Sequence, residues 1–128
     1  GGQVDAFFDN LGSSGPLYKA GKIRILAVAD SKRAPIIQEV PTFTEARLTG
    51  MQAVTWFAVV APAGTPAAVV TKLNGVFVDI LKQPEVQQRF AEQGAEPRGW
   101  SPERTGEFIK TESERWNKVI KSANVTLE

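Results

Sequence analysis

The chain has 128 residues, a formal net charge of +1, and 42% hydrophobic and 23% charged residues, which is the composition of an ordinary globular domain. It contains no cysteine and no histidine, which excludes disulfides, thiolate nucleophiles, histidine bases and the commonest zinc ligands. Such a small net charge does not attract nucleic acid or a membrane surface by itself, and no apolar run approaches the ~18 residues of a membrane span.

The first half of the chain is predicted to alternate strands with short helices. An apolar run at residues 4–8 predicts a strand that ends in turn-forming residues at 9–16, after which a short helix begins at Pro16 and ends at Gly21. Residues 22–30 change from alternating to continuously apolar, which is typical of a strand covered on both faces. The order strand, helix, strand predicts a right-handed crossover between parallel strands.

The middle of the chain contains a capping box and a third strand. Thr42 and Glu45 have the spacing of a capping box, so a short helix is expected near residues 43–47. Residues 54–60 are almost entirely apolar and precede a Pro/Gly turn. They are the third predicted strand.

The second half is predicted to consist of three amphipathic helices. The first has Thr65 as its cap, Pro66 at its first position and apolar residues at spacings of three and four up to Leu81. The second runs from Pro84 to a glycine stop at Gly94.

The third helix is predicted from Pro102 to Ser122, after a cap at Ser101. Trp116 is expected in its buried stripe and Trp100 against its first turn. The three helices have only the strand at 54–60 to pack against. We therefore expect that part of a larger protein is absent or that a second copy completes the fold.

Six segments of the sequence, taken together, resemble one family. In chain order they read "GGQVDAFFDN", "AGKIRILAVADSKRAP", "VPTFTEA", "WFAVVAPAGTPAAVVTKLN", "PEVQQRFAEQGAEP" and "SPERTGEFIKTESERWNKVIKSANV". They resemble the Bug-type extracytoplasmic solute receptors, the periplasmic binding proteins of tripartite tricarboxylate transporters. The resemblance covers nearly the whole chain but only the C-terminal half of the longer family members.

The resemblance implies an α/β fold of the periplasmic-binding-protein type (type II), with this chain a fragment containing parts of two lobes. Residues 1–55 would be the C-terminal part of lobe two, and residues 56–128 the return crossing and the C-terminal helices of lobe one. The strand at 54–60 would then cross between the lobes with Trp56 near the hinge. Without the resemblance, an ordinary core strand is the simpler interpretation.

The resemblance also implies a function. The chain would belong to a periplasmic receptor that closes on a small organic anion such as a carboxylate and presents it to the membrane subunits of the transporter, without catalysis, cofactor, metal or nucleic acid. The fragment alone would bind weakly, because half of the cleft is absent.

Ligands in open α/β sheets bind beyond the carboxyl ends of the strands. This rule selects the loop after the first predicted strand and the end of the second predicted strand. Trp56 is added to the predicted site because it would lie near the hinge. The predicted ligand-binding residues are Asn10, Gly12, Ser13, Ser14, Asp30 and Trp56. The loop leads into a helix start, where free N–H groups can bind a carboxylate. Alternatively, its polar residues only form a turn and Ser14 only caps the helix.

Other functional interpretations remain open from the residues alone. Asp5, Asp9 or Glu45 would be the acid or base of an enzyme, although no third oxygen ligand accompanies the first two as a metal site requires. Lys32 and Arg33 follow the second strand and are interpreted as a solvated loop rather than an anion clamp.

A third interpretation is a self-associating module whose strand edges pair in a homodimer or a segment-exchanged oligomer. The final Leu127-Glu128 are either native or a cloning remnant.

Overall fold

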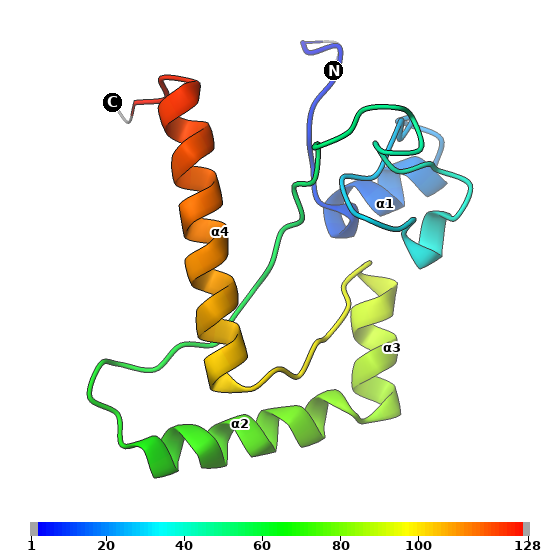
Figure 1. Cartoon of the computed structure of the whole chain (residues 1–128). Helices are drawn as coiled ribbons and strands as arrows, with labels where there is room; N and C mark the ends of the chain where they lie inside the picture. The colour runs from blue at the N-terminus through cyan, green and yellow to red at the C-terminus, as the bar shows by residue number, and fades with distance from the viewer. Residues whose placement is uncertain (1–2, 127–128) are drawn as a thin grey trace. The chain divides into compact units, whose positions relative to one another are not determined.

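The computed structural model describes residues 3–126, so the question about Leu127-Glu128 lies outside the described residues. The described chain contains α1 (Leu11–Lys19), the short 3-10 helix η1 (Pro35–Ile37), α2 (Ala67–Leu81), α3 (Pro84–Glu92) and α4 (Pro102–Ser122) (Figure 1). Within these residues, the only β-type pairing is an isolated parallel bridge between Val28 and Thr42. None of the described helices is long and apolar enough to cross a membrane.

Three helices end in the same way, with a residue in the left-handed conformation. This residue is Gly21 after α1 (φ 67°), Gly94 after α3 (φ 68°) and Asn124 after α4 (φ 51°). In each case the next amide donates back to a carbonyl in the last turn, as Ala95 N does to Phe90 O over 2.9 Å. These are Schellman motifs, and the predicted glycine stops at Gly21 and Gly94 are confirmed.

The predicted starts of α3 and α4 are also confirmed. Pro84 and Pro102 occupy the first helical positions, and Ser101 Oγ accepts a hydrogen bond from Arg104 N over 3.3 Å. The predicted cap position of α2 is one residue too early, because Pro66 and not Thr65 directly precedes the helix; the hydroxyl of Thr65 donates to Pro62 O over 2.8 Å. The helix begins at Ala67, one residue later than predicted.

The predicted start of α1 is wrong by five residues. The helix begins at Leu11 rather than Pro16, which lies inside it. The carbonyl of Asn10 accepts the N–H groups of Ser13 and Ser14 over 3.1 and 3.0 Å, so the polar run that was predicted as a loop forms the first turn. Proline lacks an N–H and so leaves one helical hydrogen bond unmade, yet the helix continues past it.

The three predicted strands do not form ladders in the described chain. Residues 4–8, 24–27 and 51–60 have no regular secondary structure, although residues 23–27 alternate between half-buried and exposed side chains as an extended segment does. Phe57 is 91% exposed. A strand is defined by a ladder of hydrogen bonds to a neighbouring strand. In residues 3–126 there is the isolated Val28–Thr42 bridge and the single bond from Ala53 N to Ala29 O, but no ladder.

The capping box is confirmed, but the helix expected after it is not formed. Thr42 N donates to Glu45 Oε2 over 2.8 Å, and Glu45 N donates to Thr42 Oγ1 over 3.1 Å. Residues 43–47 form hydrogen-bonded turns, which end where Arg47 takes a left-handed φ of 66°. The reciprocal bonds therefore fix a turn rather than starting a helix.

The chain divides into two compact units. The first contains the residues up to Phe57 together with Lys82–Pro97, and the second contains Ala58–Leu81 together with the residues from Arg98 onward. The buried hydrophobic residues of the described chain, Ile37 and Val40, both belong to the first unit. The assignment of residues 1–55 and 56–128 to lobes stays a prediction.

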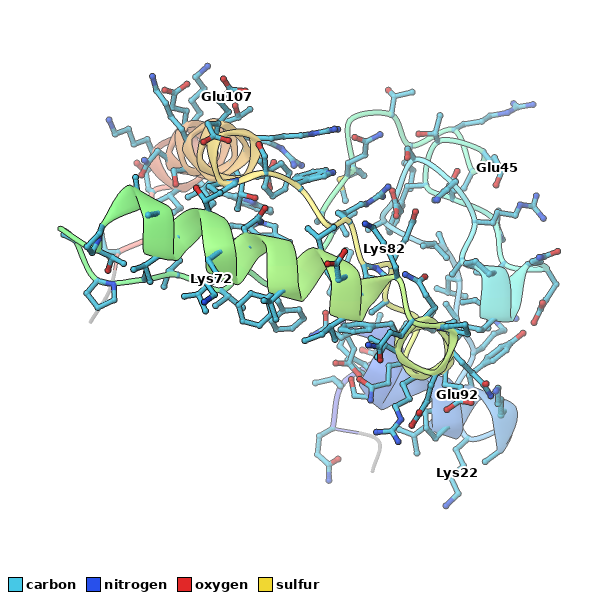
Figure 2. The ribbon with its side chains drawn as sticks, turned by 90° about the horizontal axis from the view of Figure 1, so that it is seen from below. Lys22, Glu45, Lys72, Lys82, Glu92 and Glu107 are labelled. Carbon is cyan, nitrogen blue, oxygen red and sulfur yellow. The ribbon has the colours of Figure 1, made fainter. Side chains whose placement is uncertain are left out.

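The second unit consists of α2 and α4, and neither helix has a buried residue. Side chains project from both helices in Figure 2, where Lys72 marks α2 and Glu107 marks α4. As predicted, Trp100 packs against the start of α4, edge-on to Phe108 at 5.2 Å between ring centroids. Trp116 was expected to be buried and is instead 38% exposed, because no layer of the described chain covers that stripe.

Candidate functional site

Asn10 precedes α1 at the position of its N-cap. Its side chain makes no capping hydrogen bond. Instead Asn10 Oδ1 accepts the hydroxyl of Thr55 over 2.6 Å. This bond uses the side-chain oxygen of Asn10 as an acceptor, and the side-chain amide also carries two N–H donors.

The hydroxyls of Ser13 and Ser14 are used within the first turn of α1. Ser13 Oγ lies 2.8 Å from both Asp9 Oδ2 and Asn10 O, and its single proton serves one of them at a time. Ser14 Oγ donates to Asn10 O over 3.0 Å and is 7% exposed. These two side chains stabilise the turn. The backbone N–H groups of Ser13 and Ser14 donate to Asn10 O, so the N–H groups without an acceptor inside the helix are those of its first two residues, Leu11 and Gly12.

Hydrogen bonds within the first unit connect the segments that carry the other predicted site residues to Asn10. Ala53 N donates to Ala29 O over 3.0 Å, which joins the segment before Trp56 to the segment that ends at Asp30. Thr55 joins the same segment to Asn10. Residues near 10, 30 and 55 are thus connected by hydrogen bonds, and Trp56, which is 39% exposed, directly follows Thr55.

The charged side chains near these segments are paired. Lys32 Nζ lies 2.8 Å from Glu96 Oε2. Arg33 Nε donates to both carboxylate oxygens of Glu45 over 2.9 and 3.1 Å. The Arg33 guanidinium and the Thr42 amide hold the pKa of Glu45 below its usual value. Neither cation is arranged as an anion clamp, and the described residues contain no cluster of three acidic side chains suited to a metal ion.

Thr55 was not among the residues predicted from the sequence. It was included in an apolar run and assigned to a strand, so its hydroxyl was not considered. Its position directly before Trp56 is the sequence feature that could have marked this polar residue as part of the site. Taken together, Asn10 and the first turn of α1 offer neutral hydrogen-bond donors to an anion, and Thr55 holds the Asn10 side chain through the one hydroxyl proton that it donates.

Residues 1–125 match the family described as the tripartite tricarboxylate transporter family receptor. The chain belongs to this receptor family. A curated relative, the UPF0065 protein in the tcbD-tcbE intergenic region of Pseudomonas sp., is 37% identical over 93% of this chain and 36% of its own length.

Solved structures of the family show the same fold. A structure of an R. palustris protein with adipate is 42% identical, has a TM-score of 0.82, and is matched over 92% of this chain and 40% of its own length. The periplasmic binding protein BugD is 30% identical with a TM-score of 0.80, over 90% of this chain and 39% of its own. The predicted family and the α/β fold of a periplasmic binding protein are confirmed. The chain spans between 36% and 40% of the length of these three relatives.

Proposed function

We propose that this chain is part of a periplasmic receptor that captures a small organic acid and presents it to the membrane subunits of a tripartite tricarboxylate transporter. The observation that carries the proposal is the 42% identity, at a TM-score of 0.82, to a structure determined with adipate. The description of the family names the tripartite tricarboxylate transporter, and we propose this transporter as the partner of the receptor.

Within this function, the start of α1 would bind one carboxylate of the ligand. The first N–H groups of the helix have no acceptor within the helix and carry the positive end of its dipole. Asn10 would add its side-chain N–H donors, held in place by Thr55. Trp56 would line the same site from an adjoining segment. Asp30 would lie beside the site rather than bind the carboxylate, because its own carboxylate accepts hydrogen bonds from Ser31 and would repel an anion. Neutral donors suit a receptor, because they release a carboxylate more readily than a buried ion pair does.

Residues 1–55 would belong to one lobe of the receptor and residues 56–128 to the other. The compact units differ from this division at Lys82–Pro97, which groups with the first unit, so the chain passes between the units after Phe57, Leu81 and Pro97. Several crossings of this kind are typical of hinged binding proteins, in which a few residues absorb the change in angle on closure.

A hybrid receptor tests the proposal. In it, the matching segment of this chain replaces its counterpart in the R. palustris protein, so that the cleft is complete. Adipate at a concentration of 100 dissociation constants is expected to stabilise the folded hybrid by about 2.7 kcal/mol. Succinate, benzoate and the uncharged adipamide serve as comparisons in the same thermal melts. A hybrid that melts cooperatively but does not respond to any of the acids would contradict the proposed function.

A further inference from the structure

The end of α3 lies directly against the start of α1. A Cβ atom placed on Gly94 would lie 2.9 Å from Leu11 Cδ2, 3.1 Å from Leu11 Cγ and 3.2 Å from Leu11 Cβ. A Cβ on Gly12 would lie 3.4 Å from Gln93 O. The Schellman turn of α3 therefore contacts the first two residues of α1. These belong to residues 10–14, the segment proposed to bind the ligand and called the ligand loop below.

This contact has no room for a side chain at position 94. Leu11 can rotate its Cδ2 atom away, but its Cβ is fixed to the backbone and would still lie 3.2 Å from the added carbon. Relief would therefore require a shift of a few tenths of an ångström in the backbone at Leu11 or in the turn at Gly94. Since Leu11 is the first residue of α1, a shift on its side would displace the N–H groups that begin the helix.

A second tie joins the residues after α3 to the segment before η1. Lys32 pairs with Glu96 at 2.8 Å, two residues after Gly94. Both partners are about half exposed, and an exposed pair of this kind contributes little to stability. The apolar contact between Gly94 and Leu11 is the closer packed of the two ties.

We propose that Gly94 is a positioning residue for the ligand loop, acting through Leu11 to fix where α1 begins. The proposal deepens the proposed function and rests on it for the role of the loop. The segment that carries Gly94, Lys82–Pro97, is joined at both ends to residues of the second unit. Gly94 is thus the point at which this returning segment meets the loop that would bind the ligand.

Gly21 provides a matched control. It ends α1 with the same motif and a φ of 67°, against 68° at Gly94. A Cβ added at Gly21 would meet nothing within 4 Å. Alanine carries similar backbone strain at either position, but Gly21→Ala places that strain on α1 itself. A larger effect of Gly94→Ala on the start of α1 would therefore come from the contact with Leu11.

Amide hydrogen exchange of the 128-residue chain measures the effect. The reporters are the amides of Ser13 and Ser14, which bond to Asn10 O in the first turn of α1. Gly94→Ala is expected to speed their exchange roughly tenfold, and clearly more than Gly21→Ala does. Adding Leu11→Ala to Gly94→Ala removes the Cγ and Cδ contacts and is expected to restore part of the protection.

Equal exchange at Ser13 and Ser14 in the two glycine variants would overturn the proposal, as would an effect of Gly94→Ala confined to α3. If Gly94→Ala does not fold, Leu11→Ala alone reports the contact from the other side, with the exposed Leu17→Ala as its control. Faster exchange at Ser13 and Ser14 in Leu11→Ala than in Leu17→Ala is then the supporting result, and equal exchange overturns the proposal. No ligand is present in this experiment, so failure to bind adipate would count against the proposed function alone.

Discussion

The hydroxyl of Thr55 donates a hydrogen bond to Asn10 Oδ1 over 2.6 Å, joining positions that are 45 residues apart in the chain. The bond holds the Asn10 side chain away from the helix that it precedes, where its oxygen would otherwise cap α1. It thereby determines which atoms of Asn10 are available to a ligand.

Thr55→Val should weaken this link without changing the shape of the side chain. The expected loss is about 0.5–1 kcal/mol in the free energy of unfolding, because both partners are exposed and water replaces the lost bond in part. Urea unfolding of the 128-residue chain measures it. Thr55→Ser keeps the hydroxyl and should lose less than Thr55→Val; the reverse order would show that the methyl group, and not the hydrogen bond, is important.

Asn10→Asp should separate ligand binding from stability. Aspartate is as good an N-cap as asparagine and retains an oxygen that can accept from Thr55, so the fold should be unaffected. Its charge would repel a carboxylate, and adipate binding to the hybrid receptor should weaken by about tenfold or more in calorimetric titration.

Gln38→Glu adds the same charge on an exposed residue outside the proposed site and is the control for this titration. It should leave adipate binding nearly unchanged. Equal losses in the two variants would show that only net charge is being measured, and no loss in Asn10→Asp would remove Asn10 from the site.

Acid should loosen the turn fixed by Glu45. The hydrogen bond from Arg33, followed by that from Thr42, lowers the pKa of Glu45 in the folded state. A lowered pKa means that the carboxylate contributes stability above its unfolded pKa of about 4.3 and that this contribution is lost as pH falls through the lower folded value.

Glu45→Gln keeps an acceptor for Thr42 but loses the charge that attracts Arg33. The stability difference between wild type and Glu45→Gln should therefore be largest near neutral pH and shrink below about pH 4.3. Glu39 and Glu103 also have lowered pKa values, but both residues are present in wild type and in Glu45→Gln, so their contributions cancel in the difference. A difference that stays constant from pH 7 to pH 3 would show that the Glu45–Arg33 pair does not carry the effect.

The isolated 128-residue chain should self-associate through α2. On this helix the side chains of Val69, Leu73, Val76, Phe77 and Ile80 form one apolar stripe that is between 40% and 50% exposed. On the other side, Val78 lies near Gly99 and Asn74 donates to Trp100 O over 2.9 Å. The stripe has no cover within the described chain.

Light scattering across a concentration series checks this expectation. The apparent mass should rise with concentration, and Phe77→Gln should reduce the rise more than Lys72→Gln, which changes a polar position of the same helix. A chain that remains monomeric at all concentrations would show that the stripe does not drive association.

The helices could be predicted from the sequence because their determinants are local. Proline at the first position of α3, serine and proline at the start of α4, and glycine after α3 act within one turn of the helix. The start of α1 was missed because Pro16 was taken as a first-position proline, although Asn10 and the residues after it already form the first turn.

Strand formation and the site depend on contacts that are distant in the chain. Residues 54–60 have the composition of a strand, but a ladder requires a neighbouring segment to pair with. For the same reason, nothing near Asn10 in the sequence indicates that Thr55 binds it or that Gly94 lies against Leu11. The loop itself was selected by the rule that ligands lie beyond strand ends, which does not indicate that its serine hydroxyls are used internally.

The most direct test of the proposed site is a crystal structure of the hybrid receptor with adipate. We expect one carboxylate of adipate within hydrogen-bond distance, about 2.7–3.2 Å, of the first N–H groups of α1 or of the Asn10 side-chain amide. Trp56 is expected beside the ligand. Adipate bound with all its contacts outside residues 10–14, 30 and 55–56 would contradict the site, even if the hybrid bound the ligand tightly.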